Sequence, residues 1–436
     1  MKVVVFGLWH LGTVTAACAA AAGNRVVGLD FEAATVGALA AGNPPVAERG
    51  LPELMAEQTA AGRLSFTADA GEAMRGADVL WVTIDTPVDE DDRADADNVR
   101  RQLDALAAYV PAGCVVLISS QVPTGFTRAL CREWRARRVD AYFAYSPENL
   151  RLGNAIAAFR NAERVVVGVS DKAAKPALVE LFGPFTSHIE WMGIEAAEMT
   201  KHALNAFLAT SVAFANELAR LCEQVGADAK EVERGLRSEP RVGPRAYVSP
   251  GAPFAGGTLA RDVRFLTGLG QRHGVDTPLF DGVIASNDRH KLWVRHQVDQ
   301  LLGRGGGRGA AVAVLGLSYK AGTDTLRRSL SVELCRWLRG NGAQVRAHDP
   351  QIRQLPDDLC PVIDLRPSVA EALDGADLAV VTTDSPEYRR LAAADFTANM
   401  RTARVIDENW VLAAVLADDP RITYVATGRS GTPHAT

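Results

Sequence analysis

The turn after the first predicted strand contains glycines whose spacing could serve binding chemistry. Its residues are Gly7, Leu8, Trp9, His10, Leu11 and Gly12. They form a G-x-G-x-x-G pattern in which tryptophan replaces the middle glycine. In this pattern the first glycine makes the turn and the third lets a helix pack closely. Asp30 follows Gly12 by 18 residues, where a carboxylate binds both ribose hydroxyls and repels a 2′-phosphate. An ordinary strand-to-helix turn with a packed tryptophan is the alternative, but Asp30 and the flanking strands favour binding of NAD.

A second group of polar residues lies in the middle of the chain. Lys201 and Asn205 are four residues apart in a helix-like tract, so both face the same side, although such pairs are also common on solvated helices. The glycine-rich segment PGAPFAGGTLARD, at 250–262, runs into a helix and presents Thr258 and Asp262. A threonine hydroxyl needs an adjacent base to become a useful nucleophile, whereas a thiol with a pKa of about 8.5 gives some thiolate at neutral pH.

The elements that must position these groups alternate between strands and helices. KVVVFG, the helix-like HLGTVTAACAAAAG and RVVGLD form a β-α-β pattern, which continues through GADVLWVTI, GCVVLISS and RVVVGVS. Strands that are apolar on both faces indicate a parallel sheet covered by helices. A long helical tract begins at Glu195, and a glycine-rich linker, 303–310, precedes a second set of strands. We therefore predict an α/β fold with two doubly wound Rossmann-like domains joined by a long central helix.

Composition narrows the class of protein further. The 436 residues are 47% hydrophobic and 23% charged with a net charge of −5, which is ordinary for a soluble globular protein. No basic surface is indicated for nucleic acid or anionic membrane, and no apolar run is long enough for a membrane span of about 20 residues. The six cysteines are scattered without a CxxC pair, so we expect reduced thiols in a cytoplasmic protein, with no disulfide framework and no metal site.

Three longer stretches carry a resemblance to a known family. SPENLRLGNA (146–155), EAAEMTKHALNAFLA (195–209) and PFAGGTLARD (253–262), in this order and spacing, resemble the UDP-glucose and GDP-mannose dehydrogenase family. TPVDEDDRADADNV, SSQVPTGFT, GLSYKAGTDTLRRS and VRAHDP fit as well, so the resemblance covers nearly the whole chain. It implies an NAD-binding domain over 1–194, a central helical region for dimerisation and the substrate loop over 195–302, and a nucleotide-sugar domain over 303–436.

The resemblance also implies a reaction. Family members oxidise C6 of a nucleotide hexose twice with two NAD, through a cysteine thiohemiacetal and a thioester that is hydrolysed to the uronate. The matching positions make Lys201 and Asn205 the pair that holds the reacting oxygen, Asp262 the carboxylate that assists proton transfer through water, and Glu148 a general acid or base.

Two sets of ligand-binding residues follow from the same match. The expected NAD-binding residues are those of the turn, namely Gly7, Leu8, Trp9, His10, Leu11 and Gly12, together with Asp30, Thr86, Pro87 and Gln121. The expected nucleotide-sugar residues are Asn149, Leu150, Arg151, Arg241, Tyr247, Phe254, Gly256, Thr258, Lys320 and Arg327.

The chain departs from the family where the thioester chemistry would take place. Thr258 stands at the position of the nucleophilic cysteine, Gln121 replaces the threonine of Ser-Thr-Val-Pro, and Leu152 replaces the second glutamate of Pro-Glu-x-x-x-Glu. Pro253 and Ala255 also replace glycines, which restricts the loop. Thioester formation and hydrolysis are therefore impaired, while the residues for hydride transfer remain.

Four functions follow, in order of preference. The first is a single oxidation of a nucleotide sugar to the aldehyde, with NAD. The second is four-electron oxidation through the aldehyde hydrate. The third is transient oxidation in an epimerase-type reaction, and the fourth is nucleotide-sugar binding without turnover. The segment PRVG, at 240–243, favours UDP as the nucleotide, and apolar residues around Met199 to Cys222 predict a homodimer.

Overall fold

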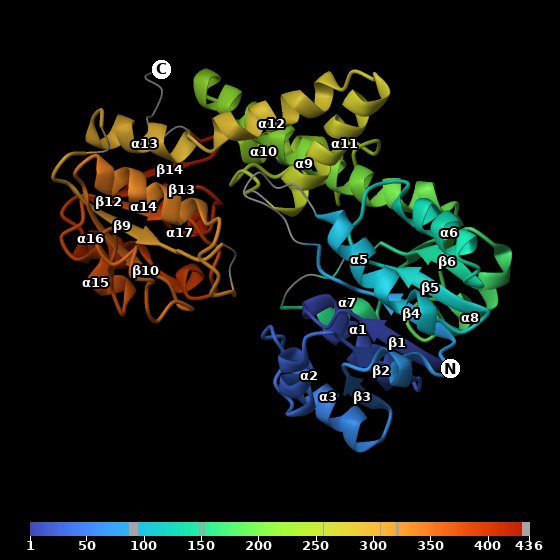
Figure 1. The fold of residues 1–436 in the computed structure, drawn as a ribbon. Helices are drawn as coiled ribbons and strands as arrows, with labels where there is room; N and C mark the ends of the chain where they lie inside the picture. Colours follow the sequence, from blue (N-terminus) through green and yellow to red (C-terminus); the bar gives the residue numbers. More distant parts are fainter. Residues whose placement is uncertain are drawn as a thin grey trace. The chain divides into compact units, whose positions relative to one another are not determined.

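The structure is a computed structural model that describes residues 1–86, 95–147, 150, 153–255, 257–305, 307–319 and 322–429 (Figure 1). The chain divides into two compact units, Met1–Leu204 and Asn205–Thr436. Each unit contains one sheet, and the predicted alternation of strands and helices is present in both.

The first unit contains a sheet in which eight described strands run in the order β3-β2-β1-β4-β5-β6-β7-β8. β6 and β7 pair antiparallel, and the other described pairs are parallel. The strands are β1 (Lys2–Phe6), β2 (Arg25–Leu29), β3 (Leu64–Thr67), β4 (Val79–Val82), β5 (Cys114–Ile118), β6 (Ala141–Tyr145), β7 (Val165–Val169) and β8 (Ile189–Met192). The order reverses at β1, so the carboxyl ends of β1 and β4 border the crevice where ligands of such sheets bind.

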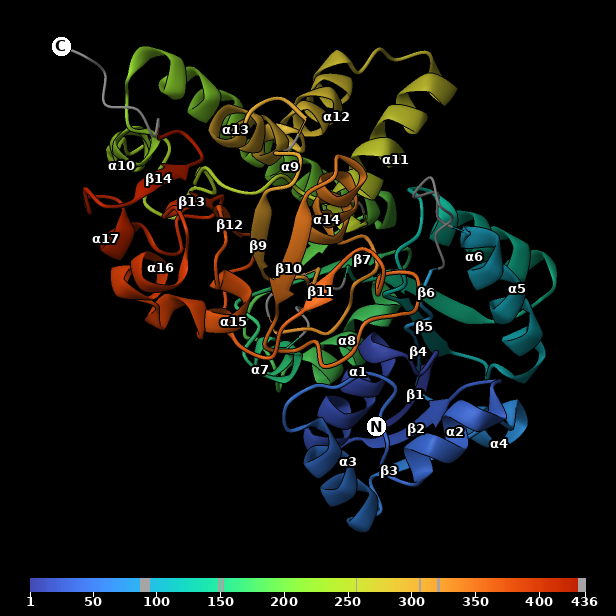
Figure 2. The same cartoon turned by 90° about the vertical axis from the view of Figure 1, so that its left-hand side faces the viewer.

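Helices cover both faces of this sheet because its strands are apolar on both sides (Figure 2). One face packs against α1 (His10–Ala21), α3 (Leu51–Ala60), α7 (Ala155–Arg160) and α8 (Lys175–Phe182). The other face packs against α4 (Ala70–Met74), α5 (Ala96–Leu106) and α6 (Phe126–Ala136). α2 (Ala33–Ala40) follows β2. Alternate residues of β1 belong to opposite cores, as the period of a strand requires.

A single helix, α9 (Ile194–Val225), spans 32 residues and joins the two units. It is the long central helix that the sequence predicts. At 1.5 Å per residue, such a helix is about 48 Å long.

The second unit begins within α9 and contains four further helices before its sheet. These are α10 (Ala229–Ser238), α11 (Thr258–His273), α12 (Pro278–His290) and α13 (Trp293–Leu302). The six described strands of its sheet are all parallel and run in the order β11-β10-β9-β12-β13-β14. They are β9 (Ala311–Leu315), β10 (Gln344–His348), β11 (Asp364–Leu365), β12 (Leu378–Val381), β13 (Arg404–Asp407) and β14 (Thr423–Ala426).

This second sheet is also covered on both faces. α13 and α14 (Leu330–Gly340) pack on one face, while α15 (Val369–Leu373), α16 (Ala393–Asn399) and α17 (Ala413–Leu416) pack on the other. The two doubly wound Rossmann-like sheets joined by a long helix confirm the predicted fold class.

Candidate active site and cofactor turn

The first glycine turn has the geometry that the sequence predicts. Gly7 follows β1 with φ of +95°, and a Cβ there would lie 2.6 Å from the Ile84 Cα. A Cβ on Gly12 would lie 1.8 Å from the carbonyl oxygen of Gly7. Both positions therefore require glycine, the first for the turn and the second for close packing of α1.

The residues around this turn suit a dinucleotide. Trp9 is the N-cap of α1, no described side chain caps the helix there, and its first turn carries no acidic residue. The amide groups that begin a helix lack partners inside it and attract anions such as a pyrophosphate. Asp30 lies beside the turn, since its carboxylate accepts the Leu8 N–H at 2.8 Å and the Glu32 N–H at 3.0 Å. These groups fit NAD, the cofactor that the sequence predicts.

Glu48 anchors this turn to a distant loop. Its buried carboxylate lies 3.1 Å from Nε2 of His10 and accepts the N–H groups of Gly153 and Ala155 at 2.8 and 2.9 Å. His10, one of the predicted NAD-binding residues, is paired with Glu48. The turn and the start of α7 therefore share one carboxylate, which the sequence analysis missed.

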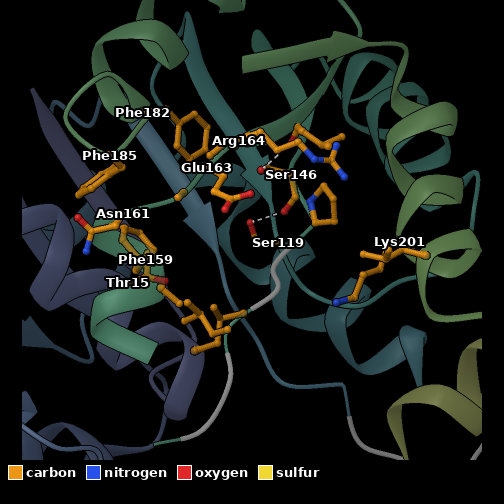
Figure 3. A pocket seen from close by; sticks show the side chains of 18 of the residues that line it. Thr15, Ser119, Ser146, Phe159, Asn161, Glu163, Arg164, Phe182, Phe185 and Lys201 are labelled. Carbon is orange, nitrogen blue, oxygen red and sulfur yellow. Dashed lines mark hydrogen bonds between the residues drawn. The ribbon is translucent and has the colours of Figure 1, made fainter. Parts of the chain in front are cut away.

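A cavity of about 480 Å³ lies within the first unit (Figure 3). Three of the predicted residues, Leu11, Leu150 and Lys201, line it, each with a different expected role. Figure 3 shows the Lys201 side chain extending from α9 toward this cavity. The structure thus brings residues predicted to contact the cofactor, the substrate and the reacting oxygen to one space.

The floor of this cavity is fixed by hydrogen bonds and ring contacts. The Trp81 indole N–H donates to the Ser119 hydroxyl at 2.9 Å, which donates to the Ser146 carbonyl at 2.8 Å. Phe159 and Phe182 pack against Trp81 with ring centroids 5.9 and 5.4 Å away. The cavity therefore has an aromatic side, and the Ser119 hydroxyl is held between Trp81 and the Ser146 carbonyl.

Two neighbours of Lys201 on α9 hold the loop that bears Gln121. The Glu198 carboxylate is buried and accepts the Gly125 and Thr127 N–H groups at 2.6 and 2.9 Å. Burial raises the pKa of Glu198. Nε2 of His202 lies 3.2 Å from the Val122 carbonyl. These contacts fix the part of α9 that carries Lys201 against residues 122–127.

Two further predicted cofactor residues, Thr86 and Gln121, follow the neighbouring strands β4 and β5. Thr86 is buried, and its hydroxyl donates to the Gln121 carbonyl at 2.8 Å. Trp9 is 52% exposed. Pro87 lies outside the described residues.

In the second unit, Asn205 and Asp262 are direct partners. The Asn205 amide donates to the Asp262 carboxylate, and the Asp262 side chain is fully buried. Thr258 is the first residue of α11, so it lies one helical turn before Asp262 on the same helix. The structure therefore brings three of the predicted residues together around the start of α11.

Asparagine side chains hold the loop that leads to Thr258. Asn216 of α9 accepts the Gly251 N–H at 2.9 Å, and Asn409 accepts the Ala252 N–H at 3.0 Å. Both asparagines use side-chain oxygens to bind loop amides. The loop is therefore fixed from α9 and from the end of β13.

α12 contributes a second pair of contacts to this loop. Asn287 accepts the Phe254 N–H at 2.9 Å and donates to the Phe254 carbonyl at 2.8 Å. Nε2 of His290 lies 2.9 Å from the Gly251 carbonyl, and burial lowers the pKa of His290 to about 4. At neutral pH His290 is uncharged, with Nε2 as the donor, so it acts as a fixed structural contact.

A cavity of about 690 Å³ lies within the second unit. Three residues that are predicted to bind the nucleotide sugar line it: Tyr247, Phe254 and Thr258. Arg241 lies on the surface in an ion pair with Glu239 at 2.8 Å, and Arg327 is exposed. The predicted residues that lie outside the described part of the chain are Glu148, Asn149, Arg151, Gly256 and Lys320.

Arg328, rather than its neighbour Arg327, approaches the loop. Its guanidinium would lie 3.8 Å from a Cβ placed on Gly257, and its backbone has φ of +61°. A non-glycine residue with positive φ is uncommon and is typical of a constrained functional segment. The sequence analysis missed this residue because the two arginines are adjacent and carry no distinguishing local signal.

Three family models match consecutive parts of the chain. The model described as UDP-glucose/GDP-mannose dehydrogenase family, NAD binding domain, matches residues 1–186. The central domain of the same family matches 195–289, and its UDP binding domain matches 313–414. UDP-glucose 6-dehydrogenase from Pseudomonas aeruginosa is 33% identical over 100% of this chain and 99% of the relative.

The chain belongs to the UDP-glucose/GDP-mannose dehydrogenase family. It is similar over 98% of each chain to a solved UDP-glucose dehydrogenase from Pyrobaculum islandicum, with a TM-score of 0.87 and 30% identity. A solved UDP-D-ManNAc dehydrogenase from Pyrococcus horikoshii has a TM-score of 0.86 and 26% identity, covering 99% of this chain and 100% of that one.

This family member is an NAD-dependent nucleotide-sugar dehydrogenase. The resemblance stated from the sequence is confirmed, as are NAD as the cofactor and a nucleotide sugar as the ligand. Within the described residues, no helix has the length and apolar character needed to cross a membrane.

Proposed function

We propose that this dehydrogenase oxidises a UDP-hexose once at C6, to the aldehyde, without a cysteine thioester. One observation carries the proposal: the residue at the start of α11 is Thr258, which lines the 690 Å³ cavity. Among the described residues that line this cavity and the 480 Å³ cavity, there is no cysteine. The thiol that a thioester requires is therefore absent from the described part of both linings.

The cysteines elsewhere in the chain support the same conclusion. Five of the six are buried, and burial raises the pKa of Cys18, Cys114 and Cys335 to about 12. Burial also raises the pKa of Cys222. Because the thiolate is the nucleophilic form, these thiols are poor candidates for covalent catalysis.

Alcohol oxidation needs different groups, and the chain retains them. Bound NAD supplies the hydride acceptor. We assign Lys201 to stabilise the C6 oxygen as its proton leaves, with Asn205 holding the same oxygen. Asp262 takes the proton through a water molecule, and Glu148 acts as a general acid or base. The hydrogen bond between Asn205 and Asp262 supports this arrangement because it orients both polar groups.

Four-electron oxidation to the uronate is the second candidate. It is favoured by whole-length relatives that carry the name UDP-glucose 6-dehydrogenase, such as a Bacillus subtilis protein that is 31% identical over 98% of both chains. Without a thiol, the second hydride would come from the hydrated aldehyde. These names also support UDP-glucose as a substrate to test first.

We also propose a homodimer built on α9. Phe207, Phe214 and Leu221 are 68%, 50% and 60% exposed and recur at intervals of seven residues. An apolar seam with this period is typical of helices that pack against a partner helix. The central region over 195–302 would then serve dimerisation, between an NAD domain at 1–194 and a nucleotide-sugar domain at 303–436.

The six cysteines are free, which supports a reducing compartment, and we propose the cytoplasm.

Substitution of Thr258 tests the proposed chemistry. Thr258→Ala should keep most of the single-turnover hydride transfer, because no covalent bond to this residue is needed. Lys201→Ala is the matched control and should lose about 2.7 to 4 kcal/mol of transition-state stabilisation, the scale of an oxyanion donor. Thr258→Cys should not restore efficient uronate formation, because Gln121 and Leu152 remain. An acyl adduct trapped on Thr258 of the wild-type enzyme would overturn the proposal.

A further inference from the structure

Glu408 is a buried carboxyl group that the roles assigned above do not use. It follows β13 directly, is 7% exposed, and lines the 690 Å³ cavity. Its backbone carbonyl accepts the Thr427 hydroxyl at 2.9 Å, but its carboxyl group has no hydrogen-bond partner among the described residues. A buried polar group without a partner is costly, so a ligand in this cavity is the natural partner.

Glu408 lies at the carboxyl end of the second sheet, one strand away from the β9–β12 pair at which the strand order reverses. Thr382 and Thr383, which follow the neighbouring strand β12, and Ser318, which lies beyond β9, line the same cavity. The carboxyl ends of parallel strands border the ligand crevice where the strand order reverses. The strand order of this sheet reverses at β9, and the segment belongs to the match with the UDP binding domain.

Burial and the adjacent Asp407 carboxylate raise the pKa of Glu408 to about 8. Asp407 is held differently, since it accepts the Leu412 and Val411 N–H groups at 2.7 and 3.0 Å and the Tyr424 hydroxyl at 2.8 Å. Its hydrogen bonds favour the charged form, although burial raises the pKa of Asp407 too. Of these two acids, Glu408 is therefore the one that carries a proton at neutral pH.

The other charged and titratable groups around the cavity come from several elements. They are Tyr247, Asp288, Lys291, Arg295, Tyr319 and Glu333. Lys291 donates to Asp288 at 2.8 Å, and the Arg295 guanidinium stacks over the Trp337 ring at 5.6 Å. Glu333 is exposed, so its charge is screened by solvent.

We propose that Glu408 contacts the nucleotide sugar as a neutral carboxyl group that donates a hydrogen bond, and that ionisation of Glu408 weakens binding at alkaline pH. A nucleoside diphosphate sugar carries negative charge on its pyrophosphate, so a buried carboxylate in the same cavity repels it, whereas a protonated one does not. This inference deepens the proposed function and rests on nucleotide binding in this cavity. Glu408 is protonated in the complex with the nucleotide sugar. The affinity for the nucleotide sugar is therefore highest below the pKa of Glu408 and falls about tenfold per pH unit above it.

Calorimetric titration of the full-length protein with UDP between pH 6.5 and 9.5 tests the proposal. The wild-type Kd should rise steeply above about pH 8, whereas Glu408→Gln should lack this rise, since its amide cannot ionise. Titration of UDP itself affects both proteins equally. Glu371→Gln removes an exposed acid on α15, a helix that does not line this cavity, and should follow the wild type. If the wild type and Glu408→Gln lose affinity for UDP to the same extent above pH 8, the proposed role of Glu408 is wrong.

A second measurement needs no substitution. At pH 8.5 in two buffers of different ionisation enthalpy, UDP binding to the wild type should take up a substantial fraction of a proton, and no uptake would overturn the proposal. Failure of the wild type to bind UDP at pH 7 would instead contradict the proposed function. If the wild type binds UDP but Glu408→Gln has the same pH profile, the role of Glu408 is contradicted and the proposed function is not.

Discussion

Asp262 lies at the centre of the proposed chemistry. It is fully buried on α11, and its carboxylate accepts the Asn205 amide. Thr258 lies one turn earlier at the start of the same helix, at the position that the family resemblance gives to a cysteine. We propose alcohol oxidation without thioester chemistry because a hydroxyl stands at this position while the Asn205–Asp262 pair is present.

Asp30 should determine the choice of cofactor. Asp30→Ala removes the acceptor for ribose hydroxyls and the charge that repels a 2′-phosphate, so the ratio of NAD to NADP affinity should fall about ten- to a hundredfold. Fluorescence titrations with NAD and with NADP measure the two affinities and hence this ratio. Asp30→Asn is the control, because it keeps an acceptor for the Leu8 N–H while removing the charge. An unchanged ratio in both variants would contradict the assignment.

At the scale of elements, Glu48 connects the first turn of α1 with the start of α7. Its carboxylate has three partners, of which two are backbone N–H groups. Residues 148–152, which precede these N–H groups in sequence, include four predicted catalytic and substrate positions and the family departure Leu152. Glu48 is therefore a positioning residue for both the cofactor turn and the start of α7.

Glu48→Ala should destabilise the protein and weaken NAD binding together. Two backbone N–H groups and His10 lose their acceptor, and the buried Ala155 N–H alone should cost about 1–3 kcal/mol in the free energy of unfolding. Denaturant unfolding and NAD titration measure the two effects. Glu48→Gln keeps one carbonyl oxygen and should lie between the wild type and Glu48→Ala. Glu53→Ala, on the exposed face of α3, is the control, and equal behaviour of the two alanine variants would refute the role of Glu48.

On the scale of the whole molecule, the two sheets repeat one arrangement. In the first unit Thr83 donates to the carbonyls of Phe6 and Gly7, and Asp30 accepts the Leu8 N–H. In the second unit Thr382 donates to the carbonyls of Leu315 and Gly316, and Asp349 accepts the N–H groups of Leu317 and Ser318. Each central strand thus ends in a glycine turn that is held by a threonine and an aspartate from the neighbouring strands.

The exposed seam on α9 should control assembly. Phe214→Glu places a charge in the middle of the seam, so the mass in solution should fall from two chains to one chain of 46.5 kDa. Light scattering at micromolar concentration measures the mass. Val415→Glu changes an apolar residue of comparable exposure on α17 and should leave the dimer intact. A wild-type mass of a single chain would contradict the proposed dimer.

Local pattern was sufficient to predict the fold class, the requirement for Gly7 and Gly12, and the long central helix. It was insufficient where partners are far apart in sequence. Glu48 contacts His10 across 38 residues and Gly153 across 105, and Asn409 contacts Ala252 across 157. Such contacts depend on which strand ends become neighbours in the folded sheet, and no spacing within a short segment encodes them.

Counting NADH per sugar tests the central claim most directly. The wild-type enzyme should be incubated with a limiting amount of UDP-glucose, and then with a panel of other nucleotide hexoses, in excess NAD. NADH is measured by absorbance and the product by mass. We expect one NADH per sugar consumed and a product two hydrogens lighter than the substrate, or its hydrate. Two NADH per sugar with a uronate product would contradict single oxidation and assign the protein to the four-electron reaction.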